Sequence, residues 1–154
     1  AGYGIHDGLD WFAMVHATNG SNYEDGDGRE IPGSEPAAQG ALAKLGYEFE
    51  THRIELGYEY SEDDADRVIK MNMDLNPSRP GQVLDTGTHP LKVRRSALTL
   101  KYSSTAPTDA WDPEAVLYFS RNEYWRNNYA TGDRPINGDM ILDSSSIGGK
   151  LQNT

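Results

Sequence analysis

Residues 41–61 read ALAKLGYEFETHRIELGYEYS, and this stretch decides the fold class. Apolar residues occupy alternate positions in two runs, 41–49 and 54–60, with charged or small residues at most of the positions between them. A period of two is typical of β-strands that have one apolar and one polar face. Only residues 50–51 separate the runs, so the pattern predicts a tight antiparallel hairpin.

The same alternation continues on both sides of this hairpin. Residues 3–5 and 9–18 flank the turn His6-Asp7-Gly8, and Asp-Gly is a strong hairpin signal. Further on, residues 93–103 and 114–125 alternate in the same way, and a last strand begins near Ser145 and reaches Thr154. No segment shows the helical period of 3.6 residues. The sequence therefore predicts an all-β chain of about seven antiparallel strands.

The expected connections are sorted by length. Residues 6–8, 50–51 and 104–112 form short or medium connections, whereas the longer ones are 20–36, 62–91 and 127–144. In an up-and-down sheet this order places short turns at one end and long loops at the other. Short periplasmic turns and long extracellular loops distinguish outer-membrane β-barrels. The residues expected to face lipid are Leu45, Tyr47, Ile54, Leu56, Leu98 and Leu100.

Composition excludes several classes of function. The 154 residues carry 24 acidic and 14 basic side chains, a net charge of −10, which disfavours binding to nucleic acid. The absence of cysteine excludes disulfides, thiolate zinc sites and a cysteine nucleophile. The N-terminal residues lack the pattern of a signal peptide, and no apolar run is long enough for a membrane helix. No catalytic motif is recognisable around the four histidines, so we expect no enzyme.

The ordered succession of segments resembles a known family. Residues 43–73, AKLGYEFETHRIELGYEYSEDDADRVIKMNM, resemble a barrel hairpin and the following loop of TonB-dependent outer-membrane receptors. Residues 2–32 look like the hairpin and loop that precede it, and residues 111–128 and 145–154 look like later strands of the same barrel. Each motif is soft by itself, because barrel strands carry little sequence information.

The resemblance implies import of a ferric siderophore, haem or cobalamin across the outer membrane of a Gram-negative bacterium. Complete receptors have about 22 strands around a plug. The present chain resembles a middle section of such a barrel, without the plug or the TonB-binding N-terminal part. The implied partners are outer-membrane lipid, an iron chelate and, through the missing part, TonB. No resident cofactor is expected.

Three places are candidate ligand sites. Arg121, Tyr124, Trp125 and Arg126 combine guanidinium groups with aromatic rings, which suits an anionic ferric siderophore and favours it over haem. His89 lies in the expected loop 62–91 and is a candidate haem ligand, although a histidine beside a proline in a long loop is more often simply solvated. The acidic stretch 22–30 resembles a calcium loop but lacks the full pattern.

Alternatives to the siderophore receptor stay open at this point. One is a haem receptor of the same family. A second is a small autonomous outer-membrane barrel, which needs an eighth strand. A third is a secreted calcium- or glycan-binding β-sandwich, because a soluble antiparallel sheet with one wet face has the same alternation.

Overall fold

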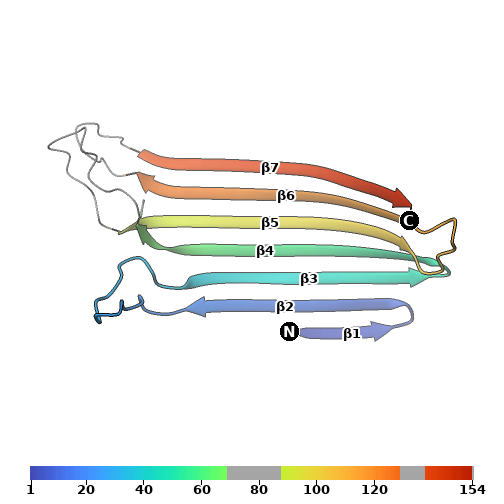
Figure 1. Ribbon diagram of the computed structural model, residues 1–154, viewed down its shortest axis with the longest axis horizontal. Coiled ribbons are helices and arrows are strands. Elements are labelled where there is room, and N and C mark those ends of the chain that lie inside the picture. Colours follow the sequence, from blue (N-terminus) through green and yellow to red (C-terminus); the bar gives the residue numbers. More distant parts are fainter. Residues whose placement is uncertain (69–87, 129–137, 154) are drawn as a thin grey trace.

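The computed structural model describes residues 1–68, 88–128 and 138–153. These residues form one seven-stranded sheet, in which every strand pairs antiparallel with the next along the chain (Figure 1). The predicted all-β class and strand number are confirmed. The strands are β1 (Gly2–His6), β2 (Leu9–Asn19), β3 (Ala37–Phe49), β4 (His52–Val68), β5 (Thr88–Ser104), β6 (Pro113–Asn128) and β7 (Gly138–Asn153).

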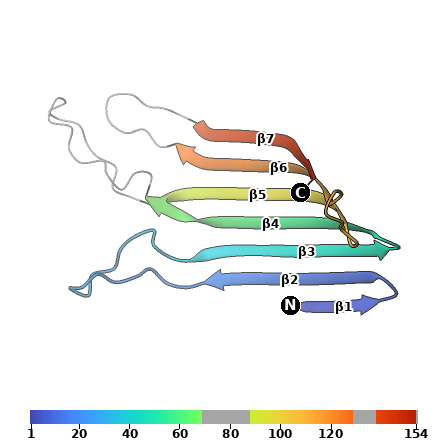
Figure 2. The same cartoon turned by 45° about the vertical axis from the view of Figure 1, so that its right-hand side comes forward.

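The connections sort to the two ends of the sheet as the sequence predicts. The turns after β1, β3 and β5 lie together at one end, and the β2–β3 connection lies at the other (Figures 1 and 2). Positive φ angles at Asp7, Gly8 and Glu50 close the first two hairpins. Asp and Gly adopt this left-handed conformation readily, so the Asp-Gly signal predicted its turn correctly.

Strand register gives the sheet two chemically distinct faces. The face that includes Leu56, here called the apolar face, carries three continuous cross-strand rows on β2–β7. The first row is Leu9, Tyr47, Ile54, Tyr102, Ala115 and Leu151. The second is Trp11, Leu45, Leu56, Leu100, Leu117 and Gly149, and the third is Ala13, Ala43, Tyr58, Leu98, Phe119 and Ile147. We call these three rows the apolar band; all six residues expected to face lipid belong to it.

The sheet has no hydrophobic core of its own. Apart from Pro113 at the start of β6, no apolar side chain in the described ranges is buried, and band residues such as Leu117 and Ile147 are 59% and 84% exposed. The described strands form a single layer, one seven-stranded sheet (Figure 2). A contiguous apolar surface of this extent is the mark of an interaction surface rather than of a water-facing one.

Four strands extend further than the sequence pattern indicates. Strands β4 to β7 are 16 or 17 residues long, so both ends of the expected loop 62–91 (residues 62–68 and 88–91) and of the expected loop 127–144 (127–128 and 138–144) belong to the sheet. The acidic residues of β4 explain the difference, because Glu62 and Asp64 form ion pairs with Arg94 and Lys92 on β5. Cross-strand pairs of opposite charge stabilise a ladder that polarity alone suggests is a loop.

Among the residues described, no helix is long and apolar enough to cross a membrane.

Candidate functional site: the charged face

The face opposite the apolar band, here called the charged face, holds the ionisable side chains of the strand centres. It carries Asp10 and His16 of β2, Lys44 of β3, Arg53, Glu55 and Glu59 of β4, Arg95 and Lys101 of β5, and Glu114 of β6. For β3 and β4, this placement agrees with the alternation of apolar and charged residues in the sequence 41–61. Charged side chains of this face therefore occur on every strand from β2 to β6.

One ion pair on this face bridges two strands that are not neighbours. Arg53 of β4 donates two hydrogen bonds to Asp10 of β2, from Nη1 to Oδ2 at 2.6 Å and from Nη2 to Oδ1 at 3.0 Å. The intervening residue on β3 is Gly46, where a Cβ would lie only 2.6 Å from Asp10 Oδ2. Glycine at this position lets the two side chains meet over the backbone of β3.

Further ion pairs lie near this bridge on the charged face, on β3 and β4 and on β5 and β6. Glu55 accepts a hydrogen bond from Lys44 Nζ at 3.4 Å and lies 3.5 Å from Arg53 Nη2. On the neighbouring strands, Lys101 Nζ lies 2.7 Å from Glu114 Oε2. Bidentate and networked pairs hold their geometry better than isolated surface pairs.

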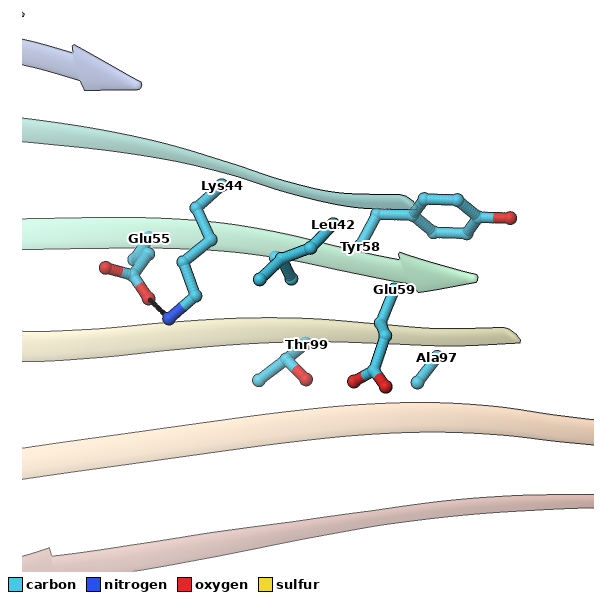
Figure 3. A pocket seen from close by; sticks show the side chains of 8 residues that line it. Leu42, Lys44, Glu55, Tyr58, Glu59, Ala97 and Thr99 are labelled. Atoms are coloured by element: carbon cyan, nitrogen blue, oxygen red, sulfur yellow. Dashed lines mark hydrogen bonds and ion pairs between the residues drawn. The ribbon is translucent and has the colours of Figure 1, made fainter. Parts of the chain in front are cut away.

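A shallow hollow lies in the middle of the charged face (Figure 3). Its volume is about 160 Å³, and small residues on β4 and β5, namely Gly57, Ala97 and Thr99, leave it open. The ion-paired Lys44 and Glu55 lie at one end and the Glu59 carboxylate at the other, beside Ala97 (Figure 3).

Apolar side chains interrupt the charged face next to this hollow. Phe12 and Met14 of β2 share the face with Leu42 of β3, and Met14 and Leu42 are directly opposite each other in the register. His16 follows on the same strand, and its imidazole lies across β3 at Gly40, where a Cβ would be 2.5 Å from its Cε1. The alternation from Leu9 onward places Phe12 and Met14 on this face, but the sequence does not show that Leu42 lies beside them, because that contact depends on the register between β2 and β3.

The structure does not bring the predicted aromatic–arginine cluster together. Trp125 and Arg121 project from the apolar side of β6, whereas Tyr124 and Arg126 project from its charged side. Arg121 pairs with Asp143 of β7, with Nη2 at 2.6 Å from Oδ2, and Trp125 donates to Asp139 Oδ2 at 3.0 Å. A strand alternates its faces, so four near-consecutive side chains cannot surround one ligand.

The two other predicted places, His89 and the stretch 22–30, have defined surroundings. His89 belongs to β5, opposite Arg67 of β4, and is half-buried on the charged side of the sheet rather than in a loop. In the 22–30 stretch, Asp25 Oδ1 accepts hydrogen bonds from the amides of Asp27 and Arg29, and Arg29 also pairs with both carboxylates. Within the described ranges, no group of three or more metal-binding side chains is placed to hold an ion.

Glu62 marks where the apolar face becomes polar, beyond the apolar band on the long-loop side. Its side chain is only 9% exposed and accepts hydrogen bonds from Arg94, from Gln39 at 2.9 Å and from Tyr60 at 2.9 Å. The hydrogen bond from Arg94 outweighs burial and, with those of Gln39 and Tyr60, lowers the pKa of Glu62 to about 2.

Comparison with known proteins identifies close relatives. The chain is 54% identical to the haem transporter BhuA of Brucella ovis and 53% identical to that of Brucella abortus, over all 154 residues. The corresponding protein of Brucella suis biovar 1 is also 53% identical. The chain spans 22% of the length of these relatives. No family model and no solved structure matches it.

The Asp10–Arg53 bridge depends on glycine at position 46. We expect Gly46→Ala in the full-length protein to displace the bridge and lower the unfolding temperature in detergent, because the new Cβ meets both side chains. Gly57→Ala is the matched control, since the nearest atoms to its Cβ would be 4.0 Å away. Equal unfolding temperatures for the two variants would show that the bridge contributes nothing.

The lowered pKa of Glu62 gives its carboxylate a pH-dependent effect on stability. A carboxyl group with a depressed native pKa stabilises the fold above its unfolded pKa, and this stabilisation is lost as pH falls toward the native value. We therefore expect wild type to have a higher unfolding temperature than Glu62→Gln at pH 7. This difference in unfolding temperature should shrink as the pH falls from about 4.5 to about 2. A pH-independent difference in unfolding temperature would contradict this.

Proposed function

We propose that this chain is a section of the transmembrane β-barrel of a TonB-dependent haem importer in the outer membrane of a Gram-negative bacterium. The observation that carries the proposal is the apolar band, which runs unbroken over six strands while the opposite face is charged. The 53–54% identity to haem transporters over the whole chain supports the assignment. The resemblance of residues 43–73 to barrel strands of that receptor family agrees with it.

The two faces require two different environments. No described residue covers the apolar band, and such an exposed apolar surface is stable when it faces hydrocarbon. In hydrocarbon, every backbone N–H and C=O group of a spanning strand must form its hydrogen bond within the sheet. The antiparallel ladders satisfy this requirement between neighbouring strands from β2 to β7. The ion pairs of the charged face belong in a hydrated lumen, which is the alternation of outer-membrane barrels.

The ends of the strands give the proposed orientation. Short turns face the periplasm and long connections face the outside in outer-membrane barrels. A spanning strand needs about 9–11 residues, so β4 to β7 extend well past the bilayer on the long-loop side. Glu62 and its neighbours then lie above the hydrocarbon, where charge on the outer surface is tolerated.

Haem is a better-supported ligand than the ferric siderophore that the sequence favoured. That expectation depended on Arg121, Tyr124, Trp125 and Arg126 acting as one site, and β6 divides them between its two faces. The named relatives are haem transporters. A β-sandwich is disfavoured because no second sheet covers the apolar face in the described ranges.

Growth on haem tests the transport proposal. The full-length protein is expressed in a Gram-negative strain that lacks its own haem receptors but retains TonB. We expect growth on haemin as the only iron source, abolished by deletion of tonB. Growth on a ferric hydroxamate chelate instead of haemin would restore the siderophore alternative, and growth without TonB would remove the proposed coupling.

Two adjacent residues of β5 test which face meets lipid. Leu100 belongs to the apolar band and Thr99 to the charged face. We expect Leu100→Arg to cost about 2–4 kcal/mol near the membrane midplane and to reduce folded receptor in outer-membrane fractions. Thr99→Arg should leave assembly nearly unchanged, since it adds one charge to an already charged surface. Equal losses for both variants would contradict the assignment of faces.

A further inference from the structure

We propose that the charged face carries a haem-contact patch, in which His16 binds the iron, Phe12, Met14 and Leu42 contact the porphyrin and Arg95 binds a propionate. This inference rests on the proposed haem transport and names the lumen wall that the ligand touches. None of these residues belongs to the ligand sites that the sequence pattern indicated.

The apolar part of the patch is out of place on a hydrated wall. Phe12 and Met14 are successive residues of β2 on the charged face, and Leu42 pairs with Met14 on β3. Met14 is 37% exposed, and Leu42 lines the hollow described above (Figure 3). Apolar side chains gain free energy only when another apolar surface covers them. A flat macrocycle passing along this wall supplies such a surface.

His16 supplies a nitrogen ligand beside these apolar side chains, on the side nearer the long-loop end of β2. It follows Met14 on the same face of β2, about 6.6 Å further along by the usual rise of a strand. Its imidazole lies over Gly40, and it forms no hydrogen bond or ion pair with any described residue. Imidazole is a common axial ligand of haem iron. Glycine at position 40 provides the space that the ring occupies.

Arg95 of β5 supplies a positive charge that complements a haem propionate. Register places it in the same cross-strand row as His16, with Gly40 of β3 and Ser61 of β4 between them. Three strand spacings separate the two strands, about 14 Å, a gap that a porphyrin with its propionates can bridge between two long side chains. Arg95 forms no ion pair within the described ranges, although Glu59 is at the diagonal position on β4. Arginine binds carboxylates in a bidentate manner.

Together, the imidazole, the apolar side chains and the arginine of the patch fit haem better than a ferric siderophore. A ferric siderophore already surrounds its iron with oxygen ligands, so it offers nothing for an imidazole to bind. Haem presents an apolar disc, an open axial position and two carboxylates, and the patch offers one matching group to each. Another segment of the full-length protein could also cover apolar side chains, but it would not need His16 and Arg95 at this spacing.

The test compares haemin with iron-free protoporphyrin IX on the full-length protein in detergent. We expect His16→Ala to weaken haemin binding at least tenfold and shift its Soret band, while protoporphyrin binding is unchanged. Added imidazole should restore the haemin spectrum of this variant. Leu42→Ala and Arg95→Gln should weaken both ligands. His6→Ala is the control, because His6 is the exposed last residue of β1, at the short-turn end of the sheet.

The outcomes separate this inference from the transport proposal. Wild type that binds haemin while His16→Ala binds it with the same affinity and spectrum would overturn the patch and leave haem transport standing. Should His16→Ala fail to fold, His16→Gln keeps a polar side chain there and must show the same loss of haemin binding. Reduced folded yield of Leu42→Ala with unchanged ligand binding would mean that another protein segment covers the patch, which also overturns it. Wild type that neither binds haemin nor supports growth on it would defeat the proposed function itself.

Discussion

The structure depends on a side-chain period of two held in one register across six strand pairs. Each ladder satisfies the backbone groups of its two strands, so the sheet forms without a core. The register then decides that every leucine of the band meets another apolar residue on the next strand. A slip of one residue would exchange the two faces and place Glu55 where Leu56 is now. Separation of environments, rather than close packing, is therefore what specifies this fold.

The charged face and the ends of the strands follow from the same constraint. Charges that have no place in the band collect on the opposite face, where Asp10, Arg53, Glu55 and Lys44 form a connected network. Beyond the band the restriction ends, and charges return to both faces, as the Glu62–Arg94 pair illustrates. The extent of the apolar band can thus be inferred from where paired charges reappear on its own side.

The sequence alone predicts what depends on local alternation. Residues 41–61 contain the β3–β4 hairpin, its faces and its turn, because each is set by neighbours in the chain. Strand length was underestimated, since Asp64 becomes part of a strand only through Lys92, and no local pattern connects them. The four side chains predicted as one ligand site on β6 are close along the chain, but the strand places Arg121 and Trp125 on one face and Tyr124 and Arg126 on the other. The proposed His16 patch combines residues from three strands, β2, β3 and β5, which only the register assembles.

One consequence concerns the way two glycines of β3 let side chains cross it. At Gly46 the Asp10–Arg53 pair passes over the strand, and at Gly40 the ring of His16 extends across it. The backbone hydrogen bonds of a sheet connect each strand only to its immediate neighbours. Shear between two strands is therefore not resisted directly by a third strand. The Asp10–Arg53 ion pair connects β2 directly to β4, and so couples the β2–β3 pair to the β3–β4 pair. A displacement of β2 against β3 therefore also strains its contact with β4, which makes these three strands stiffer against shear than the pairs that lack such a crossing.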